Sequence, residues 1–278
     1  GWGHGVEGRE EGEAAGGCQE ANKKAEAALG ECAAGLTKEK LPKATADFAI
    51  GPVKYQSMLA GSELVDLAPD KVLTIGLQHL KEEQDIFAAA AKIIDPKKKP
   101  IEVFKDIQTE HPKPGDLVAD VAKDLDKIRQ YVVDHHLVTI PSDVRATVQA
   151  TPQFDRATTF ASMDTPGPFE KRANEAYFYV TPPENDWTEL QKEQWLTSFN
   201  YFMSDLISIP EIYPGHYVQF LHLNSSKATK AEKVFGATSF IEGWAHYCEK
   251  MIVDEGFGGA APGAKPSEDE VQRAAKYR

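Results

Sequence analysis

Two short segments in the last third of the chain contain residue types that could perform metal-assisted hydrolysis. The first, residues 209–220, holds Glu211 and His216 on either side of a Pro-Gly pair, and the second, residues 240–249, holds Glu242 and His246. Imidazole and carboxylate groups suit zinc and other first-row divalent ions. Such an ion lowers the pKa of a bound water towards about 7, and a nearby carboxylate can then accept the proton.

Each segment is expected to open a helix that positions these side chains. The Pro-Gly pair before His216 suits a helix start, so we expect His216 in the first turn of the helix that follows. A second helix is expected to begin near Phe240, and in it Glu242 and His246 lie four positions apart, on one face. Two neighbouring helices would then present one set of donor atoms.

These residues define a predicted metal centre. Its ligands are His216, Glu242 and His246, its ion is Zn²⁺ or another divalent metal, and Glu211 is the general base. Glu249 is expected to orient a ligand imidazole from outside the coordination sphere. Simpler roles stay open, because His246 could be a hydrogen-bonded core histidine and Glu249 could pair with a neighbouring lysine.

Four further side chains are expected to bind the substrate or to stabilise the transition state. Tyr247 is expected to donate to a developing oxyanion, and Tyr213 and Tyr217 to contact the substrate. Arg156 is expected to bind a substrate carboxylate, because a guanidinium can hold it through two hydrogen bonds. Aromatic residues at this spacing are more commonly packing residues, and the arginine is equally an ion-pair partner.

Composition limits the classes of protein to which the chain can belong. The 278 residues include 31 Lys and Arg against 43 Asp and Glu, which gives a net charge of −12. This charge disfavours nucleic-acid binding. No apolar stretch approaches the ~18 residues of a membrane-spanning helix, so none is expected. The three cysteines form no Cys-x-x-Cys pair and give no indication of a disulfide framework.

The hydrophobic pattern predicts a mainly α-helical protein with a small β insertion. Apolar residues recur at the helical period over residues 68–95, 101–109, 116–135 and 188–207. Short β-branched or aromatic runs occur at 137–140, 144–148 and 176–180. We expect one domain, in which a loose leader (1–17) precedes a helical region (18–136), a β-rich insertion (137–187) and a helical region with the metal site (188–278).

The two motifs resemble those of the domain of unknown function 885 family. That family reads His-Glu-x-x-Pro-Gly-His-(His/Tyr)-x-Gln and then Glu-Gly-Trp-Ala-x-Tyr-x-Glu, and it is grouped with zinc metallopeptidases that have two histidine ligands and one glutamate ligand. Residues 211–219 and 242–249 match these patterns, and the resemblance extends over about residues 40–278. It implies Glu211 as base and His216 and Glu242 as ligands. Family members are considerably longer than this chain, whose ends both look cut.

One departure from the family pattern affects the metal site. Pro210 stands where the family has its first histidine, so one expected ligand is missing. Three outcomes follow: His246 replaces the missing imidazole, the site binds metal weakly, or the site is a non-catalytic relic. The first two imply a hydrolase of the peptidase type acting on a peptide or small amide. The third implies a binding or scaffold protein, and an ester or non-peptide amide hydrolase is a weaker alternative.

The sequence leaves the cellular location open. No signal peptide is recognised near the first residue, and a periplasmic or secreted location in a bacterium is compatible with a longer parent protein.

Overall fold

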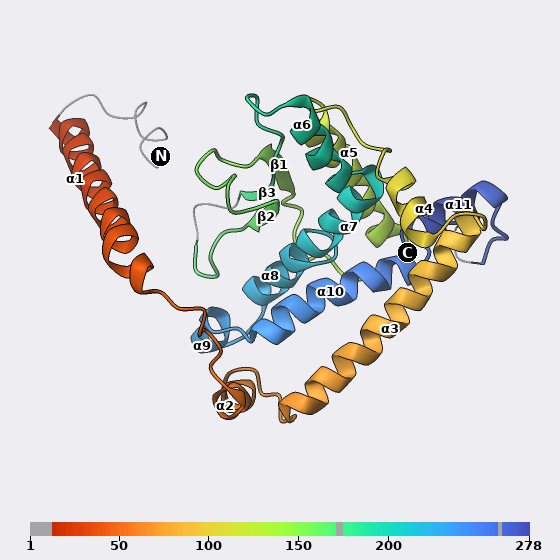
Figure 1. Ribbon diagram of the computed structural model, residues 1–278, viewed down its shortest axis with the longest axis horizontal. Helices are drawn as coiled ribbons and strands as arrows, with labels where there is room; N and C mark the ends of the chain where they lie inside the picture. Colours follow the sequence, from red (N-terminus) through yellow and green to blue (C-terminus); the bar gives the residue numbers. More distant parts are fainter. Residues whose placement is uncertain (1–12, 171–174, 261–262) are drawn as a thin grey trace. The chain divides into compact units, whose positions relative to one another are not determined.

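The computed structural model describes residues 13–170, 175–260 and 263–278, and the chain divides into two compact units (Figure 1). The first unit is Gly1–Lys54 and the second is Tyr55–Arg278. The helical region expected over residues 18–136 crosses the boundary between these units, and the expected organisation into one domain stays a prediction. All residues of the predicted metal site lie in the second unit.

The described part of the first unit is helical. Its main element is α1 (Glu13–Gly35), followed by a π-helical turn (Leu36–Lys40) and a 3₁₀ turn (Leu41–Lys43). Alanine is the best helix former, and the eight alanines of α1 favour the helix although most of its side chains are exposed. The helix begins at Glu13, so residues 13–17 of the expected loose leader are helical, and residues 1–12 lie outside the described residues.

Helices dominate the second unit, as the hydrophobic pattern predicted. None of the described helices is long and apolar enough to cross a membrane. In chain order the helices are α2 (Pro52–Ser62, which starts just before the unit boundary), α3 (Pro69–Ile94), α4 (Pro100–Ile107), α5 (Leu117–Asp134), α6 (Glu189–Ser198), α7 (Tyr201–Glu211), α8 (His216–Ser225), α9 (Lys230–Val234), α10 (Thr238–Asp254) and α11 (Glu268–Ala275).

The predicted β insertion is a three-stranded sheet. Its strands are β1 (Ala146–Ala150), β2 (Ala161–Asp164) and β3 (Ala176–Val180), in the order β1-β3-β2. The central strand β3 runs parallel to β1 and antiparallel to β2. The run at residues 137–140 forms no strand, and β2 was not predicted. Alternate residues of β3 are buried, so one face of the sheet packs against the helices.

The core forms between this sheet and the helices α5, α7 and α10. One face of α5 is entirely buried, and it packs on α7 and β1, as the helical spacing of its apolar residues predicted. α10 packs along α7 and α8, so the two helices expected to carry the site are neighbours (Figure 1). The buried face of α5 consists of Leu117, Val121, Leu125, Ile128 and Val132.

The helix expected over residues 188–207 is broken into α6 and α7. Asn200 caps α7, and its side chain accepts a hydrogen bond from the backbone N–H of Met203 at 3.1 Å. An Asn side chain at a helix start satisfies a donor that has no partner inside the helix, and it therefore favours a new start. The break allows α7 to run to Glu211, directly before the Pro-Gly turn.

Candidate functional site

A tight turn joins α7 to α8 and places Glu211 and His216 at its two ends. The backbone N–H of Gly215 donates to the carbonyl oxygen of Ile209 at 3.1 Å. A Cβ atom on Gly215 would lie 1.8 Å from the carbonyl oxygen of Pro210, so no other residue fits there without a backbone shift. The glycine of the motif is therefore required by packing, independently of any chemistry.

Trp244 holds α10 against this turn. Its indole N–H lies 3.1 Å from the carbonyl oxygen of Pro214 and 3.3 Å from that of Gly215. No role was expected of Trp244 from the sequence, although its indole N–H is a donor that needs an acceptor when it is buried. This contact sets the position of α10, and with it that of Glu242, relative to His216.

His216 and Glu242 meet across the two helices. His216 is the first residue of α8, and its Nε2 lies 3.6 Å from Oε2 of Glu242 on α10. Two donor atoms about 2.0–2.2 Å from one tetrahedral ion are about 3.3–3.6 Å apart. The separation therefore suits two ligands of a shared ion. The His216 side chain is 14% exposed and that of Glu242 is 67% exposed, so such an ion would face solvent on one side.

The other nitrogen of the His216 ring fits a metal site less well. Nδ1 is buried and has no hydrogen-bond partner among the described residues. Metal-bound histidines almost always donate the second ring N–H to a carboxylate, carbonyl or water, which fixes the orientation of the ring. The described side chains do not supply that support.

His246 does not join this pair. Its side chain is 86% exposed, and its Nδ1 lies 3.7 Å from Oε2 of Glu249, so Glu249 does face an imidazole. Within residues 13–170, 175–260 and 263–278, no three His, Cys, Asp or Glu side chains are placed to hold a metal ion. The described residues thus supply two donors, and the three-ligand set stays a prediction.

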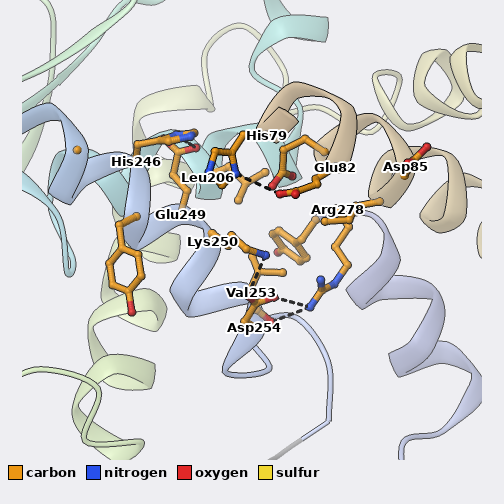
Figure 2. Close-up of a pocket in the computed structure, with 15 residues that line it drawn as sticks. His79, Glu82, Asp85, Leu206, His246, Glu249, Lys250, Val253, Asp254 and Arg278 are labelled. Carbon is orange, nitrogen blue, oxygen red and sulfur yellow. Dashed lines mark hydrogen bonds and ion pairs between the residues drawn. The ribbon is translucent and has the colours of Figure 1, made fainter. Parts of the chain in front are cut away.

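His246 and Glu249 instead line a cavity of about 1020 Å³. Figure 2 shows their side chains on α10 opposite His79 and Glu82 of α3. Tyr247 lines the same cavity and is 56% exposed. Five positions separate it from Glu242, a rotation of about 140° around the helix, so its hydroxyl belongs to a different face.

Glu211, the expected general base, lies in an environment that raises the pKa of its carboxyl. Burial raises the pKa of its carboxyl to about 7, the charge of Glu242 adds to the effect, and a hydrogen bond from the backbone of Met163 opposes it. A catalytic base works best when its pKa lies near the working pH, because it is then both ionised and basic enough to take a proton. The sequence could indicate the position of Glu211 but not this environment.

Tyr213 and Tyr217 are core residues. Both are almost fully buried, and their rings pack edge to face with centroids 5.9 Å apart. The hydroxyl of Tyr217 donates to the carbonyl oxygen of Val144 at 2.8 Å. Burial raises the pKa of Tyr217 to about 12, and the nearby Tyr213 adds to the rise. The packing alternative agrees with the burial of both tyrosines, and their contact with a substrate stays a prediction.

Arg156 forms a structural ion pair. Its Nη1 donates to Oε2 of Glu184 at 3.1 Å and its Nε to the carbonyl oxygen of Thr151 at 2.8 Å. Both side chains of the pair are 22% exposed. These contacts agree with the ion-pair alternative, and the binding of a substrate carboxylate by Arg156 stays a prediction.

A buried acid on α7 was missed. Asp205 is 8% exposed within an apolar helix, and the Tyr277 hydroxyl donates to its Oδ2 at 2.6 Å. Burial raises its pKa to about 7. The sequence feature that could have identified Asp205 is a carboxylate inside the apolar run from Tyr201 to Ile209, because buried acids are rare and need a partner.

Comparison with known proteins supports the motif match. A family model described as "Bacterial protein of unknown function (DUF885)" matches residues 5–276. No curated protein matches the chain.

Two solved structures share the fold. One is described as "a putative lipoprotein of unknown function from Shewanella oneidensis", with a TM-score of 0.66 and 23% sequence identity. The match covers 92% of this chain and 45% of the chain of that protein. The other is described as "the putative lipoprotein from Colwellia psychrerythraea", with a TM-score of 0.61 and 13% sequence identity. The match covers 81% of this chain and 37% of the chain of that protein. This chain spans less than half the length of either neighbour.

Proposed function

The chain belongs to the family described as bacterial proteins of unknown function (DUF885), and from that premise we propose that it is a metal-dependent hydrolase that cleaves amide bonds in peptides. The proposal is supported by the resemblance of the two motifs to those of zinc metallopeptidases. The observation that carries it is the 3.6 Å approach of His216 Nε2 to Glu242 Oε2, on adjacent helices and directly beyond the turn from Glu211.

Glu211 acts as the general base in this proposal. Its carboxylate accepts a proton from the water that attacks the amide carbonyl, and the resulting acid then donates that proton to the leaving amine. His216 and Glu242 would hold the ion, which supplies a more acidic water and a positive charge facing the oxyanion when it is bound. His246 and Tyr247 have no part here, because they line the cavity shared with α3.

Two protein donors make a weaker metal site than three, so we propose weak ion binding. Catalytic zinc sites usually have three protein ligands and one open position. With Pro210 in place of an imidazole and His246 paired with Glu249, two of the four positions around the ion remain for water and substrate. Weak binding is one of the three outcomes that the sequence left open.

A second candidate function is a non-catalytic binding protein that keeps the fold. The observation that favours it is the missing third donor in the described part of the chain, together with Pro210 at the position of the first family histidine. This candidate predicts that divalent ions leave the melting temperature unchanged, because a ligand stabilises a protein only if it binds the folded state.

We further propose a bacterial periplasmic or cell-surface location. This part of the proposal is supported by the descriptions of the two structural neighbours as putative lipoproteins, which are exported proteins. A reporter fusion that is active only after export would test it, and accumulation of the protein in the cytoplasm would contradict it.

The function is tested by metal content and by peptide and ester hydrolysis of the purified protein, with Glu211→Gln as the main variant. We expect the variant to lower kcat by about 10²–10⁴-fold, the range of general-base catalysis. Glu189→Gln is the control, because this carboxylate is 90% exposed on α6, and it should leave kcat unchanged. Hydrolysis that survives in Glu211→Gln would overturn the proposed mechanism, and wild-type protein without hydrolysis or metal binding would favour the second candidate.

A further inference from the structure

A second cavity, of about 680 Å³, is lined by residues of α8 and α10, the two helices that carry His216 and Glu242. The cavities that bind small molecules usually measure about 300–1,000 Å³. Its walls come from α8, α10 and the segment around α9 that connects them. The main lining side chains are Gln219, Phe220, Leu223, Phe240, Ile241 and Trp244.

Lining residues on both helices lie next to the candidate pair. On α8, the ring of Phe220 lies over that of His216, with centroids 6.5 Å apart and planes 28° apart. On α10, Ile241 and Trp244 flank Glu242 in the sequence, and Trp244 is fixed by its hydrogen bonds to the Pro-Gly turn. A group bound in the cavity would therefore lie next to a peptide bond held at His216.

The polar groups on the cavity wall are largely paired within the protein. His222 Nε2 lies 2.8 Å from the carbonyl oxygen of Thr139, Ser226 Oγ donates to the Leu223 carbonyl at 2.7 Å, and Glu232 accepts from the Thr229 backbone N–H at 2.7 Å. What remains for a ligand is mainly apolar surface. The carboxylate of Glu232 also places a negative charge there, which disfavours acidic groups.

Gln219 supplies the one polar feature that points to a peptide. It lines the cavity one turn after His216, and its Oε1 is buried without a hydrogen-bond partner among the described residues. A buried acceptor without a partner costs free energy, so a rotation of this side chain that brings Oε1 to a backbone N–H of a bound peptide would be favourable.

We infer that this cavity is the specificity subsite of the hydrolase and that it binds a large apolar side chain, preferably aromatic, next to the bond that is cleaved. The inference rests on the proposed function for the identity of the substrate. Phe220 and Trp244 provide aromatic faces, Leu223 and Ile241 aliphatic contacts, and Phe240 forms the mouth, where it is 63% exposed.

The test measures equilibrium binding by calorimetry of three blocked tripeptides, acetyl-Ala-X-Ala-amide, in which X is Phe, Ala or Asp. The protein carries Glu211→Gln, so that binding is measured without turnover. We expect the Phe peptide to bind at least about tenfold more tightly than the Ala peptide, because burial of an aromatic side chain is strongly favourable. The Asp peptide should bind more weakly than the Ala peptide.

Two variants locate the preference in the cavity. Leu223→Trp fills it and should reduce the Phe-over-Ala ratio to about twofold or less, whereas Leu190→Trp, on an exposed position of α6, should leave the ratio unchanged. Phe240→Ala opens the mouth and should weaken only the Phe peptide, by about fivefold. It serves as the second variant if Leu223→Trp does not fold.

The outcomes separate this inference from the proposed function. Equal binding of the three peptides, no measurable binding, or a preference that survives both cavity variants overturns the inference, even if the wild-type protein hydrolyses peptides. A preference that the cavity variants abolish, in a protein that cleaves none of the peptides, supports the subsite and overturns the hydrolase.

Discussion

The backbone of Gly215 packs so closely on the carbonyl of Pro210 that a Cβ atom there would lie 1.8 Å from the carbonyl oxygen. This contact closes the turn between α7 and α8, and it fixes the spacing of Glu211 and His216. Any larger residue has to push the two helix ends apart. Geometry at the candidate site and stability of the fold therefore depend on the same glycine.

Gly215→Ala should lower the free energy of unfolding by about 2 kcal/mol or more, because an atom forced into a packed backbone shifts its surroundings. Gly243→Ala is the matched control. Gly243 lies on an exposed face of α10 with nothing within 4 Å of an added Cβ atom, so this change should stabilise the helix by about 0.5–1 kcal/mol. Urea unfolding measures both, and equal effects of the two substitutions would contradict the backbone contact.

Pro210→His should strengthen zinc binding. It adds an imidazole directly before Glu211, where the family pattern has its first histidine, and a third donor should lower the apparent Kd at least about tenfold. Pro210→Ala makes the same change to the backbone without a donor and should leave the Kd unchanged. The shift of the melting temperature with zinc concentration measures both. Indistinguishable shifts in the two variants would show that position 210 does not reach the ion.

Asp205 should make the protein less stable as the pH rises from about 4 to about 7. Burial raises the pKa of this carboxyl to about 7 and Asp124 adds to the effect, whereas the Tyr277 hydroxyl and Lys127 oppose it. Because the folded-state pKa lies above that of the unfolded chain, about 3.9, the folded protein binds more protons between these values. The stabilisation is fully present below pH 4 and is lost as the pH rises towards 7.

Asp205→Asn removes this titration and keeps an acceptor for Tyr277. At about 1.4 kcal/mol per pKa unit, the loss in the wild type between pH 4 and pH 8 should be roughly 2–4 kcal/mol, so the variant should gain on the wild type by that amount. Unfolding by urea at both values measures the difference. Asp85→Asn is the control, because 67% of the Asp85 side chain is exposed. If the free energy of unfolding of Asp205→Asn changed with pH in parallel with that of the wild type, the raised pKa would be contradicted.

The sequence was sufficient for elements whose apolar residues repeat at a helical period. α3 and α5 were predicted to within a residue or two, since their apolar residues recur every three or four positions in the sequence. Only α5 buries the whole stripe, whereas α3 buries just Ala90 and Ala91. The helices α8 and α10 were also expected, and they do place His216 beside Glu242. Shorter elements escaped notice: β2 has four residues and α9 has five, too few for a period to show.

The spacing of residues on α10 was not sufficient to predict where the His246 side chain lies. Positions four apart share a face of a helix, but their directions differ by about 40°, and neighbouring side chains decide where each one points. On α10 the carboxylate of Glu249 is available to His246, so the imidazole pairs there. The spacing of residues in the sequence predicts neither this competing contact nor the burial that raises the pKa of Glu211.

The ion pair of Arg156 and Glu184 gives a last prediction. A double-mutant cycle with Arg156→Met and Glu184→Gln should give a coupling free energy of about 1 kcal/mol, because both side chains are mostly buried. The pair of Arg145 and Asp126 is the control: these side chains are 56% and 68% exposed, and their coupling should be about 0.5 kcal/mol or less. If Arg156→Met instead left stability unchanged and raised the KM for peptides with a free carboxylate, the arginine would be a substrate ligand, as its sequence context first suggested.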